Sequence, residues 1–182
     1  VANGKYSTHG IMVEVLVDGQ FGYYGTPNIS KEGVDHASMN AYKQAKAASK
    51  YSIHSFSDEV RPKSIGTYKS PFIKHIKDVS AKELNVLLLD AYKHLRVSDK
   101  IVSATSLATT IETNFHYVSS NGSDILQEFL MLEFDLSATA VEGSNQQTRT
   151  FGGMRGTCRQ VGMEFLDQME ILSQANKIGE QA

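Results

Sequence analysis

Residues 126–140 read LQEFLMLEFDLSATA, and this stretch decides the fold. Its even-numbered positions are mostly apolar, whereas the odd-numbered positions from 133 onward carry acidic residues, serine and threonine. Alternation with a period of two is the pattern of a β-strand that buries one face and exposes the other to water. We therefore expect a long strand in which Leu132 and Phe134 are buried while Glu133 and Asp135 face solvent.

The segments on either side of this strand extend it into a sheet. Residues 100–118 are rich in β-branched and aromatic side chains, and a turn centred on Asn121-Gly122 joins them to the long strand. A second turn over residues 142–145 leads into a further strand at residues 146–151. Consecutive strands joined by such turns predict a three-strand antiparallel meander.

A hairpin and helices complete the pattern. Residues 11–17 and 20–24 flank Asp18-Gly19, which suits a two-residue hairpin turn because both positions need a positive φ. Small side chains at helical spacing predict a helix over residues 31–50 that lies close against a sheet. Ser80 and Glu83 form a capping box for a helix over residues 81–97, and a last helix begins near Asp167.

The remaining segment, residues 51–78, has no sustained period and predicts a long loop with short extended pieces. The whole pattern predicts an α+β fold, with an antiparallel or mixed sheet packed by about three helices. We expect residues 1–182 to form one domain that lacks its natural start and is followed by a further domain.

Composition excludes several classes of protein. The chain has 182 residues, of which 41% are hydrophobic and 21% charged, as in soluble globular proteins. Its net charge of −2 argues against a nucleic-acid partner, which would select a clustered positive surface. No apolar run reaches the about 18 residues of a membrane span. The single cysteine, Cys158, favours a reducing compartment such as the cytoplasm.

No catalytic or metal-ligating motif is present in the sequence. The six histidines lie at least 18 residues apart, and none is followed by glutamate, whereas helical zinc sites place two histidines within about one turn. A nucleophilic Cys158 would need an oriented base, and no base lies in register with it. We therefore predict no metal, no cofactor and no catalytic residue within this chain.

A glycine-rich run at residues 150–156 is the candidate functional surface. It lacks the lysine of a phosphate-binding P-loop, and it follows an antiparallel strand rather than the parallel strand of a dinucleotide site. One interpretation assigns no binding function to this run and treats it as a bulged surface strand with solvated arginines. The functional interpretation is a surface that another backbone can approach closely, with arginines as donors; its candidate residues are Arg149, Gly152, Gly153, Arg155 and Gly156, with Arg159 as a further donor.

The order of these features resembles one known family. Gly10-Ile11-Met12-Val13-Glu14-Val15, the Asp18-Gly19 turn and the alanine-spaced helix are followed by Ser119-Ser120-Asn121-Gly122, the glycine-rich run and Gly162-Met163-Glu164-Phe165-Leu166. This order is similar to the amino-terminal half of the TldD/PmbA family, once called modulators of DNA gyrase. Glu14 stands where the family commonly has arginine, so no role of that arginine transfers to this chain.

The resemblance implies a function for the parent protein. Members of the family form a cytoplasmic proteolytic system that matures peptides, in which subunits pair into homo- or heterodimers around a peptide tunnel. The zinc motif, His-Glu-x-x-x-His, lies in the carboxy-terminal half, which is absent here. The chain would then be the non-catalytic domain that shapes the tunnel and the dimer and contacts a peptide or unfolded polypeptide. The alternatives are an inactive PmbA-type partner subunit and a free-standing α+β binding module.

Overall fold

A computed structural model describes residues 2–57, 61–153 and 156–182, without the side chain of Gln168. The chain divides into two compact units, Ala2–Lys63 and Ser64–Ala182, and each is described by itself. The whole is α+β, with a two-stranded antiparallel sheet in the first unit and a mixed sheet in the second. No helix among the described residues has the length and apolarity that a membrane crossing requires.

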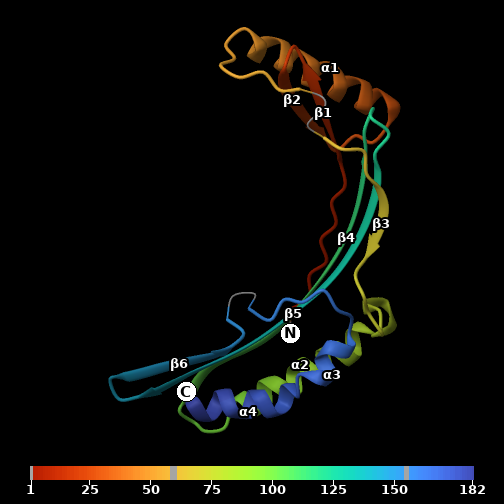
Figure 1. Ribbon diagram of the computed structural model, residues 1–182. Coiled ribbons are helices and arrows are strands. Elements are labelled where there is room, and N and C mark those ends of the chain that lie inside the picture. Colours follow the sequence, from red (N-terminus) through yellow and green to blue (C-terminus); the bar gives the residue numbers. More distant parts are fainter. Residues whose placement is uncertain (1, 58–60, 154–155) are drawn as a thin grey trace. The chain divides into compact units, whose positions relative to one another are not determined.

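The first unit is a hairpin covered by one helix (Figure 1). Strands β1 (Ile11–Val17) and β2 (Gln20–Thr26) pair antiparallel around the predicted turn. Asp18 and Gly19 both have a positive φ, 51° and 73°, as this turn demands. The predicted hairpin is therefore confirmed.

Helix α1 (Lys31–Ser49) lies close against the hairpin because its inner face is small. Ala37, Ala41 and Ala45 are fully buried, and the Ser30 side chain accepts a hydrogen bond from the Gly33 N–H as the N-cap. A Cβ added to Gly22 on β2 would lie 2.0 Å from the Ala41 carbonyl oxygen. The close helix–sheet packing expected from the sequence is confirmed.

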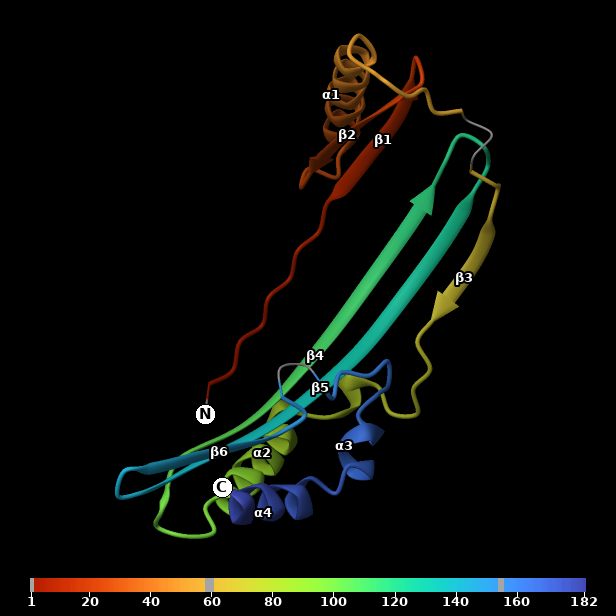
Figure 2. The same ribbon diagram turned by 60° about the vertical axis from the view of Figure 1, so that its left-hand side comes forward.

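The second unit is built on two long strands, β4 (Ile101–Val118) and β5 (Asp124–Glu142). They pair antiparallel, and β6 (Asn145–Phe151) pairs antiparallel with the other edge of β5, which confirms the meander. Strand β3 (Ile65–Lys69) adds to the same edge of β5 in parallel, so the sheet is mixed (Figure 2). The predicted long loop thus contains a strand and a short 3-10 helix, η2 (Ile76–Asp78).

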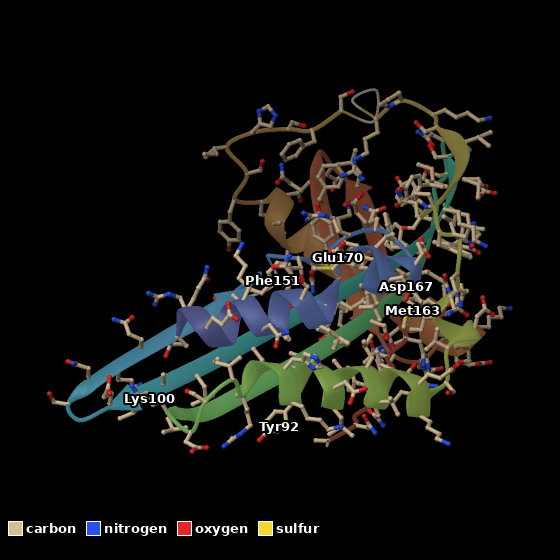
Figure 3. The ribbon with its side chains drawn as sticks, turned by 90° about the horizontal axis from the view of Figure 1, so that it is seen from below. Tyr92, Lys100, Phe151, Met163, Asp167 and Glu170 are labelled. Carbon is tan, nitrogen blue, oxygen red and sulfur yellow. The ribbon has the colours of Figure 1, made fainter. Side chains whose placement is uncertain are left out.

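The core lies between one face of this sheet and helices α2 (Ala81–Leu95) and α4 (Ile171–Gln181) (Figure 3). The Ser80–Glu83 capping box is present at the start of α2. Leu132 is 1% exposed and Phe134 is fully buried, as predicted. The buried residues that α2 and α4 pack against the sheet are Ala91, Leu95, Ile171, Ala175 and Ile178.

Two expectations from the sequence are wrong. Glu133 is 6% exposed rather than solvated, because both edges of β5 carry neighbours here and a loop lies over part of this face. The last helix does not begin at Asp167: a short helix, α3 (Glu164–Gln168), ends first, and α4 begins after Glu170. Glu170 has a left-handed backbone, with φ 45°, which separates the two helices.

Candidate functional site

The outer edge of β6 is the candidate site, because it offers main-chain groups beside the glycine-rich run. Along β5, the Val141 N–H donates to the Lys100 carbonyl on the β4 side, whereas Leu132 bonds Arg159 on the other side. Odd-numbered residues of β5 therefore direct their main-chain groups to β4, and even-numbered residues direct them to the opposite edge, where β6 pairs with residues 136–142. Because Thr148 faces the odd-numbered Thr139, its own N–H and C=O point away from β5.

Arg149 lies beside this edge. It pairs with Ala138 and so stands on the helix-covered face of the sheet, which settles the facing that the sequence left open. One guanidinium nitrogen, Nη1, donates to the Thr148 carbonyl oxygen and to the Gln147 side-chain oxygen, both at 2.9 Å. The exposed guanidinium thus occupies one outward acceptor of the β6 edge, and a peptide bound there would compete with it.

The glycines of the run allow a tight loop in which the main chain approaches itself closely. Gly152 and Gly153 have φ of 86° and 56°, a region that favours glycine. A Cβ added to Gly156 would lie 1.8 Å from the Gly152 carbonyl oxygen, so this glycine is required by the loop itself. Arg155 lies outside the described residues, and its role stays a prediction.

After the loop, the chain returns to the edge of β5. The buried Thr157 hydroxyl accepts a hydrogen bond from the Phe134 N–H at 3.0 Å and donates to the Phe134 carbonyl. Arg159 then exchanges two main-chain hydrogen bonds with Leu132, each 3.0 Å. The β5 edge is therefore occupied by the protein's own chain here, whereas the outer edge of β6 pairs with no other described strand.

Two acidic side chains of β5, Asp135 and Glu133, are covered although the sequence pattern predicts that they face solvent. Oδ1 of Asp135 is buried and has no hydrogen-bond partner among the described residues. A Cβ added to Gly152 would lie 2.7 Å from this oxygen, which places the loop directly over it. Glu133, two residues away on the same face, is also buried. The alternating pattern assigned both to solvent, because it carries no information about which loop covers a face.

Glu164, which lies beyond the glycine-rich loop, connects its own segment to the segment around Ile73 and Lys74. Its carboxylate accepts hydrogen bonds from the N–H groups of Ile73 (3.1 Å), Lys74 (2.9 Å) and Gly162 (3.0 Å). Burial acts to raise the pKa of Glu164, but the main-chain donors together outweigh it and lower the pKa below 4.5. The carboxylate is a structural anchor, since all its partners belong to the protein's own backbone.

Zinc, which the resemblance implies for the parent protein, does not fit the residues present. Within residues 2–57, 61–153 and 156–182, no three histidine, cysteine, aspartate or glutamate side chains gather into a possible metal site. Structural and catalytic zinc sites need about three or four such ligands. No step of a metal-dependent reaction is therefore assigned to this part of the chain.

Comparisons with known proteins agree with this architecture. The family model for the PmbA/TldA metallopeptidase central domain matches residues 74–182. The chain is similar in structure to a Thermotoga maritima protein described as a candidate modulator of a DNA gyrase, with 14% identity and a TM-score of 0.67. It is also similar to TldE from Thermococcus kodakarensis, with 18% identity and a TM-score of 0.60.

These two alignments cover 93% and 94% of the chain but only 36% and 37% of the solved proteins. The chain therefore spans little more than a third of either protein. At such identities, the likeness to the solved structures shows a shared fold alone. No curated protein matches the chain.

Proposed function

Because the chain belongs to the PmbA/TldA metallopeptidase family, we propose that it is a non-catalytic part of a cytoplasmic peptidase that holds an extended peptide and contributes to a dimer. The family match confirms the resemblance given by the sequence. The catalytic zinc and the residues that activate water would lie in other parts of the parent protein. This chain would position the peptide.

The outer edge of β6 is the observation that carries the proposal. An extended peptide can add to such an edge through main-chain hydrogen bonds, which makes binding tolerant of peptide sequence. Thr148 supplies an outward N–H and C=O, and the neighbouring Arg149 supplies a forked set of donors for a peptide carbonyl or carboxylate. Sequence-tolerant holding is what a protein that trims varied peptides requires.

Replacing Thr148 by proline tests this proposal. Proline removes the outward N–H, and an edge strand tolerates it where the N–H faces solvent. Thr148→Ala is the matched control, because both variants lose the hydroxyl contact with Thr139, 2.9 Å long, while only the proline variant loses the N–H. We expect Thr148→Pro to weaken binding of a fluorescently labelled, unstructured peptide by about tenfold, the value of one main-chain hydrogen bond.

Binding is read as fluorescence anisotropy, with circular dichroism confirming that both variants are folded. The alanine variant is expected to bind as the wild type does. If the folded proline variant bound the peptide as tightly as the alanine variant, the β6 edge would not be the peptide site.

A further inference from the structure

A pocket of about 240 Å³ lies on a different part of β5 from the β6 edge. Its floor is formed by β4 and β5 around Glu112, Glu128 and Leu130, and its wall is the segment that follows β3. The wall is held against the floor, because the Ser70 hydroxyl accepts a hydrogen bond from the Leu130 N–H at 3.1 Å and Ser70 is 2% exposed. The pocket is therefore preformed by the sheet.

Both signs of charge line this pocket in balanced amounts. Lys77 Nζ lies 3.2 Å from Glu112 Oε1, and Lys69 Nζ lies 3.3 Å from Glu128 Oε2. The Lys77–Glu112 pair joins the wall to the floor, whereas Lys69 is the last residue of β3 and pairs with Glu128 across neighbouring strands of the sheet. Since Glu128 faces Asn114 across the strands, Glu112 is its diagonal neighbour on the same face. The two carboxylates and the two ammonium groups thus share one small space.

The ion pairs are loose enough to exchange partners. Both are longer than the about 2.7–2.9 Å of a strong charge-assisted hydrogen bond. The side chains of Lys77 and Lys69 are 72% and 60% exposed, and exposed pairs of this kind contribute little to stability because water and salt screen them. A ligand that brings its own charges can therefore replace either partner at little cost.

We propose that this pocket binds a small zwitterion, a free amino acid or a dipeptide. Its carboxylate would lie against Lys69 or Lys77, and its ammonium group against Glu112 or Glu128. A ligand that carried only a negative charge would pair with a lysine of the lining and leave a glutamate without a partner, and a ligand that carried only a positive charge would do the reverse. The rings of Phe72 and His75, with centroids 5.0 Å apart, offer an apolar wall for the ligand's carbon atoms.

The size of the pocket limits the ligand further. The volume is below the about 300–1,000 Å³ of pockets for drug-sized molecules, which favours one or two residues over a longer peptide. The His75 Nδ1 accepts a hydrogen bond from the Lys77 N–H at 3.1 Å, which fixes the orientation of this ring in the pocket lining. This site does not depend on the proposed function at β6.

Titration calorimetry with L-alanyl-L-alanine tests the inference. The probe is compared with its N-acetyl derivative, which lacks the ammonium group, and with its carboxamide, which lacks the carboxylate. We expect millimolar binding of the dipeptide to the folded chain and at least about tenfold weaker binding of each blocked form, because each loses one charge-assisted contact. Absence of dipeptide binding at millimolar concentration, or equal binding of the blocked forms, would overturn the proposal.

Single variants assign the binding to this pocket. Glu112→Gln and Glu128→Gln each remove one candidate partner of the ammonium group, and at least one of them is expected to weaken dipeptide binding by about tenfold. Glu142→Gln removes the same charge from another exposed pair, with Lys100 at 2.6 Å, and is expected to leave binding unchanged. Unchanged binding in both pocket variants, or an equal loss in Glu142→Gln, would contradict the assignment. Thr148→Pro should leave dipeptide binding intact, so failure here is distinguishable from failure of the β6 proposal.

Discussion

The Glu164 carboxylate joins two distant segments of the chain by itself. It holds two segments about ninety residues apart in sequence through the N–H groups of Ile73, Lys74 and Gly162. A Cβ added to Gly162 would lie 2.2 Å from the Lys74 carbonyl oxygen, so the clamp also requires this glycine. The Gly162–Leu166 motif of the sequence is thus explained by structure.

Glu164→Gln is expected to lower the free energy of unfolding by roughly 2 kcal/mol at neutral pH, because charged acceptors make the stronger hydrogen bonds. The pKa of Glu164 is lowered on folding, so its contribution is present above the unfolded value of 4.5 and is lost as pH falls through the lower folded value. The difference between variant and wild type should therefore shrink in acid. Urea unfolding at several pH values measures this difference in the free energy of unfolding. Glu142→Gln, at an exposed site, is the control and should change the free energy of unfolding by no more than about 0.5 kcal/mol. A difference between Glu164→Gln and wild type that does not vary with pH would contradict the charge argument.

The acidic residues of β5 show that alternation in a sequence predicts which side chains share a face, but not whether the polar face is covered. Alternation correctly predicted the burial of Leu132 and Phe134, because a covered face must be apolar. It assigned Glu133 to solvent, although the side chain is buried. Whether the opposite face is covered depends on the loop around Gly152, which is placed by contacts distant in sequence.

At the scale of elements, the break before α4 rests on one unusual residue. Glu170 follows the end of α3 with φ 45° and ψ 49°, and its side chain makes no capping hydrogen bond. This is the position after a helix where glycine is most common, and a residue with a Cβ pays roughly 1–2 kcal/mol there.

Glu170→Gly is therefore expected to raise the free energy of unfolding, by about 0.5–1 kcal/mol once the greater freedom of glycine in the unfolded chain is subtracted. Thermal or urea unfolding measures the change. Glu170→Ala is the control, because it removes the carboxylate but keeps the Cβ, and it should bring no gain. A stabilised alanine variant would point to charge rather than backbone strain.

Elements with local signals were predicted well, and elements that depend on distant partners were not. The Asp18-Gly19 turn, the Ser30 cap and the Ser80–Glu83 capping box each define a boundary within a few residues of sequence. Strand β3 has no such signal, since its five residues are all exposed and it pairs with β5 about sixty residues later. Glu170 also carries no turn signal, so the split between α3 and α4 was missed.

At the scale of the whole molecule, the site could be found only in part. Arg149 and the glycines at 152, 153 and 156 are neighbours in sequence, and the structure keeps them in one strand and loop. Which face of the sheet the Arg149 side chain occupies depends on the register between β5 and β6 across the turn after Glu142. A shift of one residue in that register would move the side chain to the opposite face. The charged pocket brings together residues 69–77, 112–114 and 128–130, and no single stretch of sequence shows it.

The proposed non-catalytic role of this chain gives the last prediction, which concerns metal. Zinc affinity needs three or four ligands held together, and the described parts of the chain gather no such group. The 182-residue chain should therefore retain no stoichiometric zinc after dialysis against a weak chelator, as measured by elemental analysis. A parent protein with a His-Glu-x-x-x-His helix, treated identically, is the positive control. About one zinc per chain in the fragment itself would show that this part of the protein takes part in the metal centre, and the proposed non-catalytic role would then be wrong.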